Sequence, residues 1–483
     1  MDRRSFLKTS AAASLGTAID ASARAKTAGA RPNILYLFSD QHRAVSLPDE
    51  PYSPTVAPNL ETFRKQNVSM DACISNYPLC TPHRAILMSG RYPAETGVNH
   101  NGIPLPVETL SIGETFRTSG YHTGYIGKWH LAGGPERNFV PKGPRRFGFE
   151  DWHVWDDTNN HYGSWTYDPD SGEKIQPEGY NATLMTDQAV KFLHDQVTGK
   201  PWFLIVSWNP PHPPFNPPDQ DKKPYPLDSL KSRPNVRLAP VGVNLGPRRK
   251  PLNSLDNFRE AQQGYYGGIT AIDLEFARVL KALAESGHAE NTIVIYTSDH
   301  GEMMGSHGHM GKQMPHEESC RVPFFVRSPG VTPKSHSSQV LFASIDIYPS
   351  LCGLAGLPVP NHCRGRDLSA ALRGEKAATP EHVFLANETG KPDTAEEFQP
   401  GYRGLRTATH TYAVMESGRW LLYDNIADPY QLKNLIKDPA QAGLIAQFDK
   451  SIQAWIEMTG DNFPYNNALQ SYSEYPDYPV AMT

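Results

Sequence analysis

The chain has 483 residues, too many for one ordinary hydrophobic core, so we expect a large domain together with a smaller one. Hydrophobic residues make up 39% of the chain and charged residues 20%, which is typical of a folded protein and not of a disordered one. The formal net charge of −5 argues against nucleic acid as a partner, and beyond the N-terminal segment no apolar run is long enough to span a bilayer.

The N-terminal segment has the pattern of an export signal. Arg3 and Arg4 precede a weakly apolar, alanine-rich run over residues 11–19, and the small residues Ala23 and Ala25 fit a signal-peptidase site. We predict a twin-arginine signal peptide over residues 1–25. The protein would then be bacterial and exported by the twin-arginine translocase to the periplasm or the medium. The alternative is a basic, amphipathic start of the folded domain.

Three almost continuously apolar runs are typical of strands buried on both faces: residues 33–39, 202–207 and 292–298. Between the last two runs, apolar residues from Ile269 to Leu283 form one stripe of a helix, which stops at Gly287. Buried strands that alternate with helices predict an α/β sandwich with a mostly parallel central sheet.

Near residue 380 the pattern changes to short pieces of strand-like composition. Residues 412–415 and 420–423 flank the turn Ser417-Gly418, which predicts a hairpin in a small antiparallel sheet. A helix follows with an apolar side over residues 444–456, and it is predicted to end at Gly460. The remaining residues, rich in tyrosine and proline, are expected to form an extended tail.

Two long segments show no periodicity: residues 133–181, rich in aromatic residues, and residues 209–254, rich in proline. We expect these segments to be long loops that wall or cover a site.

From the change of pattern near residue 380, we predict a large α/β domain over residues 31–380 and a smaller α+β domain over residues 381–483, which contains the antiparallel sheet, the helix and the tail.

Two aspartates, Asp40 and Asp299, each stand directly after an apolar strand. Ligands bind at the carboxyl ends of strands in open α/β sheets, so the two acids can converge on one point. Gln41 and His300 follow them and add an amide and an imidazole. We predict a divalent-cation site, because oxygen ligands suit calcium or magnesium and an imidazole also suits manganese. The alternative is that each pair caps the end of its strand.

Cys80 is predicted to stand at the N-terminus of a helix. Thr81 can act as the N-cap and Pro82 fits the first helical position. The helix dipole and the free amides at such a place favour an anion. Cys80 is therefore either a nucleophile with a lowered pKa or a buried structural thiol.

The chain has five cysteines, an odd number that calls for an explanation in an exported protein. If Cys80 is consumed chemically, four remain. Cys352 and Cys363 could pair across a short loop, and reduced buried thiols are the alternative.

Six motifs in family order resemble those of type I sulfatases, in the alkaline phosphatase-like superfamily. They are residues 80–84 (CTPHR) followed by 89–91 (SGR), residues 127–131 (GKWHL), residues 211–215 (PHPPF), residues 298–302 (SDHGE), Gly311-Lys312, and residues 422–424 (LYD) with 428–429 (DP) and 434–435 (NL). The resemblance covers nearly the whole chain after residue 25 and implies an alkaline phosphatase-like fold for the large, catalytic domain.

The resemblance implies two groups that the sequence itself does not contain. A formylglycine-generating enzyme would oxidise Cys80 to 3-oxoalanine, or formylglycine, during maturation. A divalent cation, with calcium as the first expectation and magnesium or manganese as alternatives, would be held by Asp40, Gln41, residue 80, Asp299 and His300. Gln41 departs from the usual second aspartate, and it is either a ligand or a donor to a ligand. His83 also stands where serine or alanine is frequent, outside the Cys, Pro and Arg positions that the maturation enzyme reads.

The resemblance also implies roles in the hydrolysis of a sulfate ester. Arg84 and Lys128 would hold the formylglycine, and Lys128 and Lys312 would neutralise the sulfate oxygens. One hydroxyl of the hydrated aldehyde would attack sulfur to give a covalent sulfo-enzyme. His130 would then deprotonate the second hydroxyl and expel sulfate, and His212 would protonate the leaving group.

The expected substrate is a sulfated carbohydrate or another sulfated small molecule. Trp152 and Trp155 could stack on sugar rings, and a buried role is the alternative for each. Two other functions remain open. A phosphonate monoester or phosphodiester hydrolase of the same superfamily would use the same chemistry, and an inactive glycan-binding homologue would leave Cys80 unmodified.

Overall fold

The computed structural model describes residues 31–133, 139–155, 159–196, 199–237, 254–328, 336–388, 401–469 and 471–473. The predicted signal peptide and the end of the predicted tail lie outside these residues. Within them, no helix combines the length and the apolar character that crossing a membrane requires.

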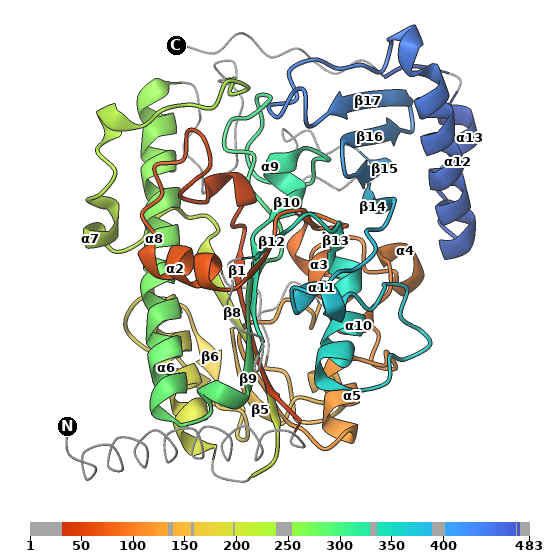
Figure 1. The fold of residues 1–483 in the computed structure, drawn as a ribbon. Coiled ribbons are helices and arrows are strands. Elements are labelled where there is room, and N and C mark those ends of the chain that lie inside the picture. Colours follow the sequence, from red (N-terminus) through yellow and green to blue (C-terminus); the bar gives the residue numbers. More distant parts are fainter. Residues whose placement is uncertain are drawn as a thin grey trace, which may run out of the picture.

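An eight-stranded, mostly parallel sheet forms the centre of the large domain (Figure 1). Its strands are, in spatial order, β12 (His336–Ser338), β2 (Val68–Met70), β11 (Phe324–Arg327), β9 (Thr292–Ser298), β1 (Asn33–Asp40), β8 (Trp202–Pro211), β4 (His122–Lys128) and β5 (Asp151–Trp155). The neighbours from β9 to β5 are all parallel, and β11 is antiparallel to β9 and β2. The predicted fold class and the three predicted strands β1, β8 and β9 are confirmed.

Helices cover both faces of this sheet, and the alternation of side chains along β1 shows why. Leu35 and Leu37 belong to one core cluster and Tyr36 and Phe38 to the other, because successive side chains of a strand point to opposite faces. One face packs against α2 (Pro58–Gln66), α6 (Asn181–Asp195) and α8 (Leu255–Glu285). The other packs against α3 (Cys80–Ser89), α5 (Ile112–Thr118) and α10 (Ser344–Ala355), as Figure 1 shows.

Helix α8 begins well before the predicted apolar stripe. It starts after Ser254, whose side chain accepts a hydrogen bond from the amide of Asn257, and continues to Glu285. Its first half contains glycines that face the proline-rich loop after β8. A Cβ atom on Gly264 would lie 2.2 Å from the carbonyl oxygen of Phe215, so only glycine allows the helix and this loop to approach so closely.

The two segments predicted to be long loops contain regular structure, and that part of the prediction is wrong. Residues 133–181 include β5 of the main sheet and the two-stranded sheet of β6 (Thr166–Tyr167) and β7 (Lys174–Ile175). The segment 209–254 includes the end of β8 and the short helix α7 (Asp219–Lys222). Three other short helices, α4 (Pro93–Thr96), α9 (Glu317–Cys320) and α11 (Ser369–Leu372), lie elsewhere in the large domain, with a small sheet of β10 (Arg321–Val322), β3 (Cys73–Ile74) and β13 (Phe342–Ala343).

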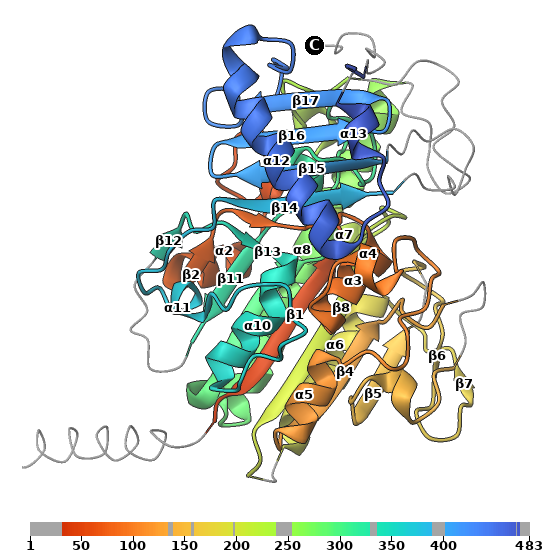
Figure 2. The same cartoon turned by 90° about the vertical axis from the view of Figure 1, so that its right-hand side faces the viewer.

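The C-terminal part is a four-stranded antiparallel sheet with helices on one face, as Figure 2 shows. The strands are β14 (His382–Asn387), β15 (Tyr402–Thr407), β16 (His410–Met415) and β17 (Gly418–Asp424), and the helices are α12 (Ala442–Thr459) and α13 (Tyr465–Ala468). The predicted hairpin is β16–β17, and the predicted helix is α12, which ends at Gly460 with a φ of 67°. This sheet shares a hydrophobic core with Ile74, Tyr77 and Ile86 of the large domain. The domain boundary near residue 380 stays a prediction.

Candidate active site

The predicted site residues gather at one edge of the main sheet, where its parallel strands end. Asp40 is the last residue of β1 and Lys128 is the last residue of β4. Asp299 follows β9 directly and His212 follows β8 directly. These are four adjacent strands, β9, β1, β8 and β4, and the carboxyl edge of a parallel sheet is where ligands bind.

Cys80 is the first residue of α3, which begins two positions earlier than the sequence suggests. Leu79 is the N-cap and makes no side-chain capping bond, so the prediction that Thr81 caps the helix is wrong. The Thr81 hydroxyl instead donates to the carbonyl oxygen of His130 at 3.1 Å. This bond ties the start of the helix to the turn after β4. Cys80 remains at a helix N-terminus, as predicted.

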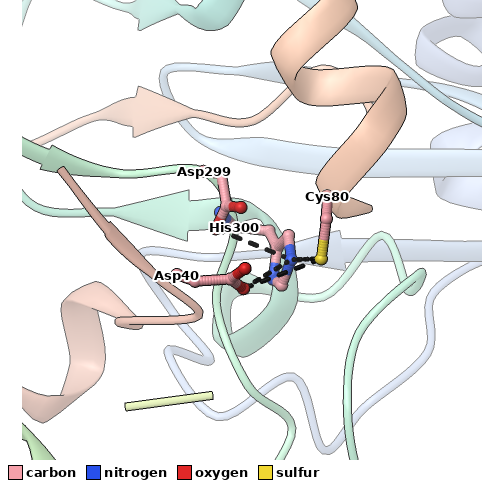
Figure 3. Close-up of side chains that lie close together, drawn as sticks. All are labelled: Asp40, Cys80, Asp299 and His300. Atoms are coloured by element: carbon pink, nitrogen blue, oxygen red, sulfur yellow. Dashed lines mark hydrogen bonds and ion pairs between the residues drawn. The ribbon is translucent and has the colours of Figure 1, made fainter. Parts of the chain in front are cut away.

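Four of the predicted metal ligands form a compact, fully buried cluster (Figure 3). One ligand atom from each of Asp40, Cys80, Asp299 and His300 lies within 4.8 Å of all the others. The Cys80 Sγ lies 3.2 Å from His300 Nε2 and 3.6 Å from Asp40 Oδ1. Two carboxylates, one imidazole and the side chain of residue 80 therefore face a common point.

The protonation of His300 shows that this cluster fits a cation. Its Nδ1 lies 3.0 Å from the carbonyl oxygen of Gly301, so Nδ1–H donates there and Nε2 keeps its lone pair. Burial holds the pKa of His300 below its ordinary value, which keeps the ring neutral. The lone pair of Nε2 then faces carboxylate oxygens of Asp40 and Asp299 at 3.5 and 3.6 Å. Such a set of donors could hold a divalent cation.

Positive side chains surround the same carboxylates. Lys128 Nζ lies 2.6 Å from Asp40 Oδ2, and Arg84 Nη2 lies 3.5 Å from Asp40 Oδ2 and 3.2 Å from Asp299 Oδ2. Burial alone would raise the pKa of Asp40, but the charges around it, with Lys128 foremost, outweigh burial and hold this pKa well below its usual range. Asp40 is therefore a carboxylate.

Lys312 approaches residue 80 from a loop far along the chain. Its Nζ lies 3.4 Å from Cys80 Sγ and 2.7 Å from Gln41 Oε1. The side-chain nitrogen Nε2 of Gln41 donates to Glu302, so Gln41 contacts the site through its side-chain oxygen Oε1. Glu302 belongs to a motif visible in the sequence, yet the sequence assigned it no role.

Asn159 is a site residue that the sequence did not indicate. Its Oδ1 accepts a hydrogen bond from Lys128 Nζ at 3.0 Å. It lies in the segment whose lack of periodicity suggested only a loop. No sequence signal could have found it, because its place depends on how the chain returns over the edge of the sheet.

His212 lies beside this cluster in the proline-rich loop after β8. Its Nδ1 lies 2.7 Å from the carbonyl oxygen of Pro213, so Nδ1–H donates there and Nε2 is left with a lone pair. Burial, and then the positive charge of Lys312, holds the pKa of His212 well below its ordinary value. The ring is therefore neutral. His130 follows Lys128 by two residues, in the turn whose carbonyl oxygen binds Thr81.

Trp152 and Trp155 are packed in the protein interior, with 3% and 2% of their surface exposed. Trp152 contacts the ring of Trp129 in one core cluster, and Trp155 belongs to the cluster on the opposite face of the sheet. This burial favours the packing role over stacking on a sugar. All five cysteines are free thiols, including Cys352 and Cys363.

The sequence and the fold match one family of known proteins. The family model named Sulfatase matches residues 32–357, and the model for the C-terminal region of N-sulphoglucosamine sulphohydrolase matches residues 305–458. An ulvan-active sulfatase of Formosa agariphila is 33% identical over 442 residues, which cover 90% of this chain and 82% of that protein. An endo-4-O-sulfatase of Bacteroides thetaiotaomicron is 31% identical, with coverage of 84% and 88%.

Solved structures give the same result for the fold. A structure from a Bacteroides thetaiotaomicron locus for glycosaminoglycan metabolism has a TM-score of 0.78 and 28% identity, and the match covers 93% of this chain and 100% of that one. A phosphonate monoester hydrolase of Agrobacterium radiobacter has a TM-score of 0.74 at 22% identity, over 89% of this chain and 96% of that one. At that identity the likeness shows the fold alone.

Proposed function

The chain belongs to the sulfatase family and is a sulfuric ester hydrolase, and from this premise we propose that it removes sulfate from sulfated carbohydrates with a formylglycine made from Cys80. The names of the relatives support the substrate class, because one acts on ulvan and another is an endo-4-O-sulfatase. Export through the predicted signal peptide would bring the enzyme to such substrates.

The position of residue 80 is the observation that carries this proposal. Its side chain stands at a helix N-terminus, 3.2 Å from the imidazole of His300 and 3.4 Å from the ammonium of Lys312. An oxygen nucleophile on this side chain would lie between a cation site and a lysine that can neutralise a sulfate oxygen. No arrangement of this kind is needed for a structural thiol.

The cation is proposed to be calcium, with magnesium and manganese as alternatives, held by Asp40, Asp299, His300 and the matured residue 80. When both groups are present, the hydrated aldehyde would supply the nucleophilic oxygen, and the cation would lower the pKa of that oxygen.

The side chains around residue 80 bind and orient the reacting groups. Arg84 holds both metal-binding carboxylates and donates to the carbonyl oxygen of Lys128 at 2.6 Å, so it fixes the edge of the sheet on which the site is built. Lys128 is held by Asp40 and Lys312 by Gln41, and both lysines are proposed to bind the sulfate oxygens. His130, in the turn beside the helix start, is proposed to remove the proton that releases sulfate from residue 80.

His212 is proposed to protonate the leaving oxygen of the sugar. In the free enzyme its ring is neutral, so the ring must take up a proton from solvent when the anionic substrate binds. A bound sulfate ester is an anion, and it offsets the positive charge of Lys312 that lowers the pKa of His212. The ring Nδ1 is held by Pro213, which leaves Nε2 as the atom that carries this proton.

One experiment tests the function and separates it from the alternatives. The enzyme is produced with a formylglycine-generating enzyme, and the mass of the peptide that contains residue 80 is measured together with hydrolysis of sulfated oligosaccharides and a phosphonate monoester. We expect the mass of formylglycine and preference for the sulfate ester. Cys80→Ala should fold and lose turnover, whereas the control Cys73→Ala, which removes another buried thiol, should keep it. An unmodified thiol, or preference for the phosphonate, would refute the proposal.

A further inference from the structure

The side-chain amide of Gln41 lies between a carboxylate and an ammonium. Its nitrogen Nε2 donates to Glu302 Oε2, and its oxygen Oε1 accepts from Lys312 Nζ at 2.7 Å. Lys312 in turn lies 3.4 Å from the side chain of Cys80. A chain of contacts therefore runs from Glu302 through Gln41 and Lys312 to the residue proposed to carry the nucleophile.

The chemistry of the two neighbours fixes which end of the amide faces which. A carboxylate only accepts hydrogen bonds and an ammonium only donates them. Reversing the Gln41 amide would place Nε2 against the ammonium of Lys312 and Oε1 against the carboxylate of Glu302, which would lose both bonds. Glu302 thus decides that Gln41 presents an oxygen to Lys312.

Glu302 is itself held rigidly. It is fully buried, and its second oxygen, Oε1, accepts from the backbone amides of Met304 at 2.9 Å and Gly311 at 2.6 Å. These bonds close the loop from residue 302 to residue 311, and Lys312 is the next residue. The same carboxylate therefore sets both the amide that Lys312 contacts and the backbone that carries Lys312.

The backbone of Gln41 is also fixed. Its φ is +80°, in the left-handed region that a glutamine rarely adopts, and a conformation of this kind persists only where surrounding contacts hold it. The amide donates to Asp299 Oδ1 at 3.0 Å, and the carbonyl oxygen accepts from the hydroxyl of Tyr265 at 2.8 Å. The side chain can therefore respond to a change at Glu302 by turning its amide, while these two bonds hold the backbone.

We propose that Glu302 is a positioning residue, which acts through Gln41 to hold the ammonium of Lys312 against residue 80. This rests on the role of Lys312 in the proposed function. Gln41 replaces the aspartate usual at its position, and the pair Gln41–Glu302 then supplies an oxygen toward Lys312 while the negative charge stays on Glu302. Compared with an aspartate at position 41, the pair places its negative charge on Glu302, farther from the cation site. Lys312 still donates to an oxygen at position 41.

Exchanging the two side chains tests the proposal. In Glu302→Gln the oxygen of the new amide must accept from the two backbone amides, so its NH₂ group faces the NH₂ group of Gln41. The Gln41 amide then turns over and directs its own NH₂ group at Lys312. We expect kcat to fall ~100-fold with little change in KM, the effect of losing one donor that acts on the transition state. Gln41→Glu places two carboxylates together and should lower both kcat and Tm. In the double variant the new amide at position 302 donates to the new carboxylate at position 41, whose other oxygen faces Lys312, so kcat should return to within about tenfold of the wild type.

Thermal unfolding after chelation of all metal gives a second measurement, which does not depend on catalysis. The double variant should be more stable than the sum of the two single changes predicts. Glu318→Gln is the matched control: Glu318 is an equally buried carboxylate in a neighbouring segment, bound to Arg233 at 3.2 Å and Asn235 at 2.8 Å, and it should show no such rescue with Gln41→Glu.

Gln41→Met removes the side-chain amide and leaves Glu302 with its backbone partners. It therefore tests whether Glu302 acts through Gln41 on Lys312 even if Glu302→Gln does not fold. It should lower kcat by a similar factor. Wild-type kcat in Gln41→Met, or additive losses in the double variant, would overturn the proposal. If the Tm values are non-additive but the protein has no sulfatase activity, the coupling of Gln41 and Glu302 would stand and the proposed function would be refuted.

Discussion

The ammonium of Lys128 lies 2.6 Å from Asp40 Oδ2, although the two residues are 88 positions apart in the chain. They stand at the ends of β4 and β1, which are not neighbours, because β8 lies between them. Gly127 allows this contact. Its φ is +101° and a Cβ atom there would lie 2.0 Å from the carbonyl oxygen of Ser207, so a side chain at this position would push β4 away from β8. A long side chain at residue 128 can then reach across the end of β8.

Replacing Lys128 with methionine, which has a similar shape and no charge, should abolish turnover and destabilise the fold. Asp40 would lose its nearest positive neighbour and keep Arg84 at 3.5 Å and the charge of Lys312, and removing one partner of a buried ion pair costs about 3–5 kcal/mol. Urea unfolding measures the loss. Lys191→Met is the control, because Lys191 pairs with Asp195 on an exposed helix surface, where such pairs contribute about 0.3–0.5 kcal/mol. Equal losses in the two variants would show that the buried pair is not stabilising.

The parts of the fold that could be predicted are those in which burial on both faces requires an almost continuously apolar sequence. Strands β1, β8 and β9 are apolar on both faces because helices cover both faces of the sheet. Strand β5 escaped prediction, since it is a short edge strand that pairs with β4 alone. The first half of α8 escaped for a different reason. Gly264, Gly267 and Gly268 have poor helix propensity, and they are present because the loop that carries His212 packs against them.

The same distinction holds within the site. Asp40 and Asp299 could be predicted because each follows an apolar strand, and parallel strands end at one edge. Asn159 and Glu302 could not be assigned from the sequence, because their partners Lys128 and Gln41 are 31 and 261 positions away. Thr81 was misassigned as a helix cap because a threonine before a proline suits a cap. Only the fold shows that its hydroxyl donates to the carbonyl oxygen of His130 instead.

Removing the cation with a chelator should abolish activity and lower Tm. A cation that binds only the folded state contributes about 2.7 kcal/mol at a concentration of 100 times Kd. The fall should be limited, because Arg84 Nη2 lies 3.5 and 3.2 Å from the two carboxylates and offsets their repulsion. Reloading with calcium, magnesium and manganese in separate samples, followed by Tm and rate measurements, identifies the ion. Full activity in a sample shown by elemental analysis to be free of metal would contradict the metal assignment.

Stability should fall in mild acid, partly because of His83. Burial lowers the pKa of His83 from 6.5 to about 3, so the folded protein keeps the ring neutral while the unfolded chain takes up a proton. The contribution is complete above pH 6.5 and decreases as the pH falls from 6.5 toward 3, at about 1.4 kcal/mol per pH unit. Below that range both states are protonated and the loss stops.

His83→Gln should therefore lose stability less steeply with acid than the wild type. The ring Nδ1 of His83 lies 3.1 Å from the hydroxyls of Ser75 and Ser344, and a glutamine amide can replace these contacts without titrating. Urea unfolding at several pH values between about 4 and 7 measures the two slopes. Parallel curves for the two proteins would show that His83 is not protonated on unfolding.

Replacing His212 with alanine separates a general acid from a residue that only shapes the loop. General acid catalysis is typically worth about a hundred- to ten-thousand-fold, in proportion to how strongly the leaving oxygen needs a proton. A sugar alkoxide needs one, whereas a nitrophenolate leaves readily as the anion. His212→Ala should therefore reduce kcat/KM on a sulfated sugar far more than on 4-nitrophenyl sulfate, and comparing the two ratios places both effects on one scale. His309→Ala is the control, because His309 is another buried, neutral histidine, whose pKa burial lowers to about 3, and no role in proton transfer is proposed for it. It should change the rates on both substrates by the same factor. Equal losses on the two substrates in His212→Ala would mean that His212 contributes binding or structure, and Lys312 and His316 would then be the next residues to test as the acid.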